Sequence, residues 1–351
     1  IEGLQRALLE RLAERIRRFA EAQRACLLPL DAAVEGGRAG HRWLPVERAG
    51  AYAPGGRYPL PSSVLMTLVP AQVAGVDGLA VASPRPGPVT LAAAALGGAG
   101  HLLAVGGAQA IAALALGVDD LPPADVVVGP GNRWVTAAKK HLVGEVGIDG
   151  LAGPSELVVL ADDAADPELV AADLVGQAEH DPDAVPILVT TSADLVPAVE
   201  DALGRQLEDL PTADVARASL RGQGAAVVVT DLDEAARVAD HLAPEHLELQ
   251  VRDPDRLAER VRAYGGLFVG AGSGEVFGDY GAGPNHVLPT AGGARFGAGL
   301  SVLTFLRPST FLRLDRPGEL VGDAAALARL EGLEGHARSA ERAVGIQGAK
   351  E

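Results

Sequence analysis

Four short polar segments, far apart in the sequence, carry side chains of the kinds that bind a divalent metal and move protons. They are residues 177–180, 244–246, 278–286 and 331–336, and each lies in an otherwise apolar or glycine-rich context. Four of the eight histidines fall in these segments. Imidazole, carboxylate and amide groups are ligands that suit zinc and its first-row neighbours, and such sites are usually assembled from distant segments. The sequence therefore predicts one composite site for a metal and an acid–base group.

Composition limits the possible classes of function. The 351 residues are 48% hydrophobic, enough for a large core in more than one domain. The formal net charge of -16 argues against nucleic acid or an anionic membrane as partner, because Lys and Arg drive phosphate binding. The single cysteine, Cys26, excludes a disulfide framework and a cysteine-based zinc site and fits a reducing compartment. Without a signal-peptide pattern or a membrane-length apolar stretch, we expect a cytoplasmic protein.

Apolar periodicity indicates the class of fold. Residues 4–25 have helical spacing, and after residue 52 short apolar runs alternate with Ala-rich segments, as in parallel βαβ units. The predicted strands are 78–83, 101–105, 125–128, 157–161, 186–191, 225–230, 247–251 and 266–270. The predicted helices are 89–96, 108–116, 133–142, 167–179, 193–207, 232–242 and 254–263. The fold class is therefore α/β, with two Rossmann-like open parallel-sheet domains plus a small helical C-terminal segment.

The same pattern predicts the domain boundaries. We expect an N-terminal helix and linker over 1–51 that packs on the second α/β domain, a first α/β domain over 52–155 and a second over 156–299. The segment 300–351, helical from Pro308, is too short for a core of its own and is expected to lie against another surface.

Ligands of open α/β sheets bind beyond the carboxyl ends of the strands, and we expect the polar segments to lie there. Residues 106–109 and 129–132 each follow a predicted strand and open a helix. Their glycines allow close backbone approach, and the free amides of a helix start favour an anion. Neither matches the three-glycine dinucleotide fingerprint, so a ligand loop and an ordinary tight turn both remain open.

Three of the four polar segments also have a simpler interpretation. Gln177 and His180 share a helical face and can point at one metal, with Glu179 pointing elsewhere, but His180 can also cap the helix. Glu245 and His246 suit a general base with a carboxylate that activates water, or a solvated strand end. Asp279 and His286 lie in a glycine-rich loop, which is usually a surface connection but also a reasonable ligand site.

Longer strings that contain these residues resemble the histidinol dehydrogenase family over residues 4–345. They include Tyr52-Ala-Pro-Gly-Gly56, Gly129-Pro-Gly-Asn132, Ala152-Gly-Pro-Ser-Glu156, Gln177-Ala-Glu-His-Asp-Pro182, Ala243-Pro-Glu-His-Leu247 and Gly283-Pro-Asn-His-Val-Leu-Pro-Thr290. The resemblance implies an enzyme that oxidises an amino alcohol to an amino acid in two hydride transfers to NAD, through a bound aldehyde.

The resemblance also implies roles for individual residues. Zinc ligands correspond to Gln177, His180, Asp279 and His336, and NAD contacts in the 52–155 domain to Tyr52, Gln109 and Asn132. Substrate contacts correspond to Ser155, His246, His286 and Glu331 together with the zinc ligands, and the acid–base pair to Glu245 and His246. Family members are homodimers in which the C-terminal segment completes the partner's site. Glu331 and His336 are therefore expected to act across the interface.

Two other functions stay open, because family members carry further N-terminal residues that this sequence lacks. One is a paralogous zinc- and NAD-dependent dehydrogenase for another amino alcohol, an imidazole alcohol or sulfopropanediol. His286, Glu331 and His336 favour histidinol, since they would recognise its amine and imidazole. The other is a non-catalytic ligand-binding or assembly homologue, against which the intact Glu245 and His246 argue.

Overall fold

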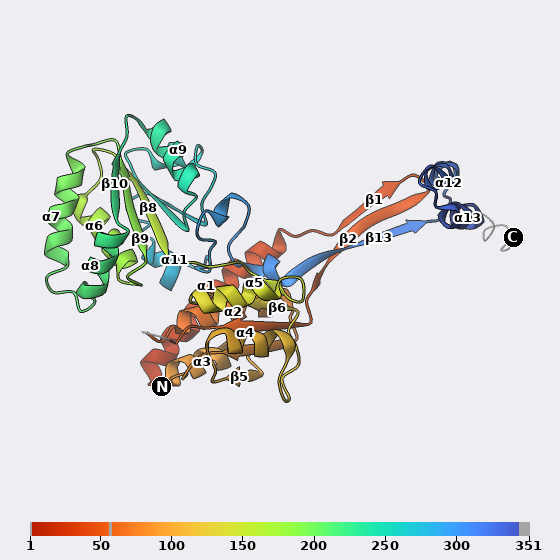
Figure 1. The fold of residues 1–351 in the computed structure, drawn as a ribbon, viewed down its shortest axis with the longest axis horizontal. Coiled ribbons are helices and arrows are strands. Elements are labelled where there is room, and N and C mark those ends of the chain that lie inside the picture. The colour runs from red at the N-terminus through yellow and green to blue at the C-terminus, as the bar shows by residue number, and fades with distance from the viewer. Residues whose placement is uncertain (1, 56–57, 344–351) are drawn as a thin grey trace. The chain divides into compact units, whose positions relative to one another are not determined.

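The computed structural model describes residues 2–55 and 58–343, so Gly56 and residues 344–351 of the predicted C-terminal segment lie outside the described residues. The chain forms two compact units. One comprises Ile1–Arg24 and Val46–Phe305, and the other comprises Ala25–Pro45 and Leu306–Glu351. The first unit contains two open parallel sheets with helices between their strands, so the predicted α/β class is confirmed (Figure 1).

The first sheet has five parallel strands in the order β5-β4-β3-β6-β7. The strands are β3 (Arg48–Tyr52), β4 (Gly78–Ala82), β5 (His101–Leu103), β6 (Val126–Val128) and β7 (Gly147–Ile148). The helices are α2 (Pro61–Ala74), α3 (Pro88–Leu96), α4 (Gly107–Leu116) and α5 (Arg133–Leu142). Strand order reverses between β3 and β6, which is where such sheets bind ligands. Tyr52 ends β3 and the 129–132 loop follows β6, so two of the three predicted cofactor segments flank this switch point, and the third, residues 106–109, follows β5.

The second sheet repeats this order with β10-β9-β8-β11-β12, all parallel. Its strands are β8 (Glu156–Ala161), β9 (Val185–Thr190), β10 (Ala225–Val228), β11 (His246–Gln250) and β12 (Gly266–Val269). Its helices are α6 (Pro167–Ala178), α7 (Leu195–Gln206), α8 (Ala213–Gly222), α9 (Leu232–Leu242), α10 (Pro254–Ala258) and α11 (Val276–Tyr280). The switch point of this sheet lies between β8 and β11.

Alternate residues of β8 pack into different cores. Val158 and Leu160 pack with the buried residues of α9 and α10, whereas Leu157 and Val159 pack with those of α6 and α7. Figure 1 shows α9 on one side of the sheet and α6 and α7 on the other. Because both faces are covered, the strand is a continuous apolar run and is easily predicted from sequence.

The N-terminal region differs from the prediction beyond its first helix. Helix α1 (Gly3–Ala25) forms as expected, and its arginines reach both α/β domains: Arg15 donates to the Gly281 carbonyl and Arg17 to the Gln72 side chain. The predicted linker instead contains β1 (Leu30–Val34) and β2 (Gly37–Pro45), and β3 belongs to the first sheet. Strands β1 and β2 were missed because mainly small and polar residues, exposed in β1 and mostly half-buried in β2, fill them without a regular apolar alternation.

The C-terminal segment also begins differently. Residues expected to be helical from Pro308 instead continue β13 (Leu306–Leu314), which pairs with β2 in an antiparallel three-stranded sheet. Pro308 is tolerated because β13 is an edge strand of that sheet. The short helices η1 (Gly293–Arg295) and η2 (Val302–Phe305) precede it, and α12 (Leu320–Leu330) and α13 (Glu334–Ala343) follow it. Within the described residues, no helix is both long and apolar enough to cross a membrane.

Candidate functional site

The predicted acid–base and metal residues of the second sheet meet at the amino ends of its strands, not at the carboxyl ends as expected. His246 begins β11, beside the start of β8. Helix α6 runs back from the carboxyl edge of the sheet, so its last turn brings Gln177 and His180 to the amino edge. The expected location at the carboxyl ends of the strands holds only for the first sheet. In the second sheet the polar side chains lie at the end of helix α6, whereas the expectation relied on the free amides at the start of a helix.

Asp279 lies in a short helix and not in the predicted loop. Helix α11 aligns it with Glu275, the residue before the helix and four positions earlier, on one face. One ligand atom from each of His180, Glu275 and Asp279 lies within 4.8 Å of the others, and His180 Nε2 is 4.0 Å from Asp279 Oδ2. Sequence reasoning missed Glu275, because its spacing from Asp279 has meaning only once the helix is known.

Gln177 supplies the sign that a ligand belongs here. Its side chain is completely buried, yet neither Oε1 nor Nε2 has a hydrogen-bond partner among the described residues. Leaving a buried amide unsatisfied costs about 1–3 kcal/mol. Glu179 points elsewhere as predicted and accepts a hydrogen bond from Thr212. An imidazole, carboxylates and an amide oxygen form a set that suits zinc, so the residues present fit the metal.

His246 is buried, so a solvated strand end is wrong. Its Nδ1 lies 3.0 Å from the Glu156 carbonyl oxygen and donates to it, which leaves the lone pair on Nε2. Nε2 has no hydrogen-bond partner among the described residues and lies 3.9 Å from both Glu275 Oε1 and Asp279 Oδ1. Burial lowers the pKa of His246 to about 4. The ring is therefore a neutral acceptor that faces the carboxylates.

Glu245 and Glu156 hold each other's backbone. Glu245 Oε2 accepts from the Glu156 amide at 3.0 Å, and Glu156 Oε2 accepts from the Glu245 amide at 3.3 Å. Glu156 Oε1 also accepts from the Ala291 amide at 2.8 Å. Burial raises the pKa of Glu245 well above its usual range, against the opposing effect of the Glu156 amide. This exchange fixes the Glu245–His246 pair at the edge of the sheet.

The loop after α11 brings His286 to the same cluster. His286 Nδ1 donates to the Asp279 carbonyl at 3.1 Å, and its Nε2 lies 3.4 Å from Ser63 Oγ of α2. Asn285 donates to the Met66 carbonyl, which fastens the loop to the same helix. Ser155, half-buried, directly precedes β8. All predicted substrate residues of the first unit thus lie on segments that border the cluster. Ser63, which was not predicted, lies there as well, beside His286.

The predicted cofactor residues lie at the carboxyl edge of the first sheet. Tyr52 accepts a hydrogen bond from the Gly107 amide at 3.3 Å, which connects β3 to the 106–109 loop. Gln109 and Asn132 are exposed at the starts of α4 and α5. Asn132 Oδ1 caps α5 by accepting from the Trp134 and Val135 amides. The cap uses only this oxygen, which leaves the Asn132 amino group for a ligand.

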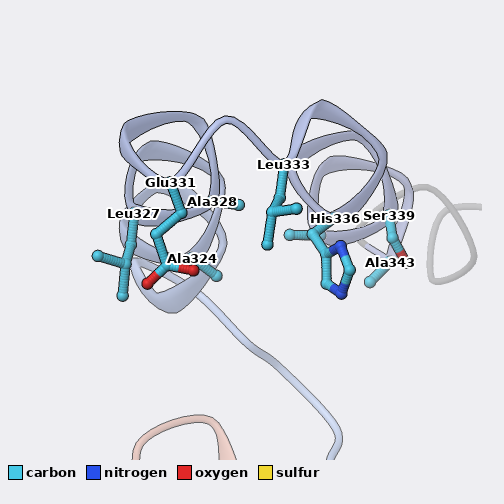
Figure 2. Close-up of a pocket in the computed structure, with 9 residues that line it drawn as sticks. Ala324, Leu327, Ala328, Glu331, Leu333, His336, Ser339 and Ala343 are labelled. Atoms are coloured by element: carbon cyan, nitrogen blue, oxygen red, sulfur yellow. The ribbon is translucent and has the colours of Figure 1, made fainter.

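Glu331 and His336 lie in the other unit. Glu331 follows α12, His336 lies on α13, and both are exposed. Figure 2 shows that their side chains extend to the same side of the helix pair, where they line a pocket together with Leu327, Leu333 and Ser339. The predicted pair therefore shares one surface, separate in sequence and unit from the residues of the second sheet.

A buried polar row extends from His246 along β11. His246, Glu248 and Gln250 alternate along the strand and so share one face. Gln250 donates to Asp173 Oδ2 of α6 at 2.8 Å, whereas the completely buried carboxylate of Glu248 has no hydrogen-bond donor among the described residues. Burial and the neighbouring Asp173 raise the pKa of Glu248 to about 9. The row therefore holds a proton at neutral pH.

Comparison with known proteins identifies the family to which the chain is similar. The family model described as histidinol dehydrogenase matches residues 1–343. The histidinol dehydrogenase of Thermus thermophilus is 54% identical over 298 residues, which cover 84% of this chain and 72% of that protein. That of Parasynechococcus marenigrum is 48% identical over 348 residues, 96% of this chain and 78% of that protein.

Solved structures give the same result at the level of the fold. The crystal structure of histidinol dehydrogenase from Elizabethkingia anophelis matches with a TM-score of 0.94 and 33% identity, and the match covers 99% of this chain and 82% of that one. A propionaldehyde dehydrogenase from Clostridium phytofermentans matches with a TM-score of 0.53 at 13% identity, which is a likeness of fold alone.

The proton on Glu248 makes stability depend on pH in the metal-free protein. Because the folded-state pKa is raised, the free energy of unfolding falls as pH rises from the unfolded value of 4.5 towards about 9. Glu248→Gln cannot ionise and can donate to Asp173, so it should be more stable at pH 8 by about 1–3 kcal/mol and vary less with pH. Urea unfolding of the EDTA-treated protein at pH 5 to 9 measures this.

Exposed Glu200 is the matched control for this substitution, and Glu200→Gln should leave the profile unchanged. A Glu248→Gln protein whose stability at pH 8 equals or falls below that of the parent would contradict the assignment.

Proposed function

Because the chain belongs to the histidinol dehydrogenase family, and is thereby an oxidoreductase, we propose that it oxidises L-histidinol to L-histidine with NAD and zinc, through bound histidinal. This reaction would serve histidine biosynthesis in the cytoplasm. The observation that carries the proposal is the convergence of His180, Glu275 and Asp279 beside His246 Nε2, which has no hydrogen-bond partner among the described residues.

The metal ligands of the proposal are Gln177, His180, Asp279 and His336, with Glu275 as a neighbour that can join them. When bound, zinc orients the imidazole and amine of the substrate, and NAD accepts hydride from its alcohol carbon. The unsatisfied amide of Gln177 and the buried carboxylates of Glu275 and Asp279 supply the negative and polar groups that compensate a cation. His286, Ser155 and Glu331 are assigned to the substrate.

His246 is the proposed general base. Its Nδ1–H bond to the Glu156 carbonyl fixes the ring, and its neutral form is favoured by burial, so Nε2 can take the proton of the substrate hydroxyl as hydride leaves the carbon. Glu245 then takes a proton from the water that hydrates the aldehyde. Burial makes its carboxylate a stronger base than an exposed glutamate. His246 gives its proton to the aldehyde oxygen as the hydrate forms, and it can then remove a hydroxyl proton of the hydrate in the second oxidation.

The cofactor contacts of the proposal are Tyr52, Gln109 and Asn132. A short connection relates their sheet edge to the base. Thr136 Oγ1, near the start of α5, donates to the Ala152 carbonyl at 2.6 Å, and the Glu156 amide donates to Glu245. Four residues span at most about 14 Å, so a nicotinamide beside α5 can reach the alcohol that His246 deprotonates.

Glu331 and His336 are assigned to the site of a partner subunit in a homodimer. Both are exposed and lie on one surface with an imidazole and a carboxylate, the groups that would complete a zinc and amine site. The proposal therefore requires two copies for each complete site.

Replacing the base should stop chemistry without removing the metal. The parent enzyme with zinc should reduce two NAD for each histidinol consumed and should prefer histidinol to sulfopropanediol. His246→Asn keeps a donor for the Glu156 carbonyl but loses Nε2, so kcat should fall by about 10²- to 10⁴-fold. NADH absorbance in the steady state measures this, with bound zinc as the second readout.

His241→Asn, at an exposed position on α9, is the control and should retain parental kcat. A His246→Asn enzyme with parental kcat would show that another group takes the proton.

Removing a ligand should remove zinc. Loss of a residue that only supports a metal ligand typically weakens metal binding by roughly 10- to 100-fold. Glu275→Gln should weaken zinc binding within that range, and His180→Ala, which removes a proposed ligand, should weaken it by more. Competition with a chromophoric chelator gives both affinities in the absence of substrate. Parental zinc affinity in His180→Ala would place the metal elsewhere.

Shared sites predict complementation between inactive chains. His246→Asn and His336→Ala are each expected to be inactive, but a mixed dimer has one site in which both residues are intact. Refolding them together should restore roughly a quarter of parental activity, since half of the dimers are mixed and each has one complete site. Glu245→Gln mixed with His246→Asn is the control and should restore none. Absence of recovery in the first mixture, with dimers present, would mean that each chain completes its own site.

A further inference from the structure

A buried ion pair lies beneath the 129–132 loop, apart from the metal and acid–base residues. Lys139 of α5 is 2% exposed, and its Nζ lies 2.5 Å from Oδ1 of Asp149, which directly follows β7. In residues 2–55 and 58–343, every other ion pair of a lysine or arginine has side chains at least 31% exposed. A pair withdrawn from water in this way loses its hydration, so its net effect on stability is small or unfavourable.

The pair holds both backbone polar groups of Gly129. Lys139 Nζ donates to the Gly129 carbonyl at 2.6 Å, and the Gly129 amide donates to Asp149 Oδ2 at 2.6 Å. The Gly150 amide donates to the other carboxylate oxygen, so the carboxylate is itself fixed. Charge-assisted bonds of this length are among the strong ones, so the first residue of the loop has one position relative to α5 and β7.

Gly129 also has no room to move. Its φ is +108°, and a Cβ atom there would lie 2.1 Å from the Tyr52 carbonyl oxygen. The loop thus passes directly against the end of β3, from which the Tyr52 hydroxyl reaches the 106–109 loop. Three residues later Asn132 caps α5, the helix that carries Lys139. The ion pair therefore closes a ring of contacts around the switch point of the first sheet.

We propose that Lys139 and Asp149 are positioning residues of the dinucleotide site, which hold the 129–132 loop in the conformation that binds the cofactor. This inference rests on the proposed use of NAD. Neither side chain is exposed, so neither touches the cofactor, and the pair adds no net charge. Its effect is on the geometry of Gly129 and Asn132, and it should therefore appear in the affinity for NAD and not in the chemical step.

The test replaces the pair while avoiding an uncompensated charge. Lys139→Met/Asp149→Asn keeps an acceptor for the Gly129 amide but loses the hydrogen bond from Lys139 Nζ to the Gly129 carbonyl. Its dissociation constant for NAD, by isothermal titration calorimetry without alcohol substrate, should rise about 10- to 100-fold, the effect of a small displacement in a binding site. KM for NAD should rise in parallel, and kcat at saturating NAD and zinc content should stay within about threefold of the parent.

Lys140→Met is the matched control, because this neighbouring lysine on the same helix is exposed, and it should bind NAD as the parent does. Quenching of Trp134, which adjoins the loop, gives a second readout in a Trp43→Phe background that removes the other tryptophan. If the double variant does not fold, Asp149→Asn alone is measured.

The outcomes separate this inference from the proposed function. A folded double variant that binds NAD within twofold of the parent, even with a lower melting temperature, would overturn the positioning role and leave the proposed function intact. A parent chain that binds no NAD would overturn both. If the double variant binds NAD more weakly than the parent, and the parent binds NAD but does not oxidise histidinol, the positioning role is supported and only the proposed substrate is contradicted.

Discussion

Burial of carboxylates without matching positive charge is the constraint on which the rest of this structure depends. Glu245, Glu275 and Asp279 are nearly inaccessible around one point, and no lysine or arginine forms an ion pair with them among the described residues. Burial raises the pKa values of Glu245 and Glu275 well above their usual range. Such a cluster is costly unless a proton or a cation compensates it, and the unsatisfied amide of Gln177 faces the same requirement. The proposed metal would answer both.

The two sheets have the same strand order but use opposite edges. The first offers loops and helix starts at the carboxyl ends, where exposed amides and Asn132 suit an anionic ligand. The second offers the end of α6, the start of β11 and α11 at the amino ends, where side chains are buried. The proposed dinucleotide would need the first environment. An acid–base group whose pKa must shift needs the second, because only burial shifts it far.

The parts of the fold that could be predicted from the sequence are those with a regular apolar pattern. Strands such as β8 and helices such as α6 are continuous apolar runs or amphipathic patterns, so sequence alone places them within a few residues. Strands β2 and β13 were not predicted. They pair with each other, residues 37–45 with residues 306–314, and they bury little apolar surface. Gln177, His180 and Glu245 were identifiable as chemistry-bearing residues. Glu275 and Glu248 were not, since a carboxylate at a helix start or within a strand normally faces water, and only the fold shows that these do not.

Residues 149–156, which connect the two sheets, fix the 129–132 loop and the Glu245–His246 pair relative to each other. Within eight residues, Asp149 holds Gly129, the Ala152 carbonyl accepts from Thr136, and Glu156 exchanges backbone bonds with Glu245. The Gly153 amide donates to Thr290 of the loop that carries His286. In the proposed reaction, hydride and proton would leave one alcohol, so the acceptors of both must be held in the productive geometry. Because each of these bonds holds a different part of the proposed site, a change in the path of this segment would displace the 129–132 loop and His246 relative to each other, even with both sheets intact.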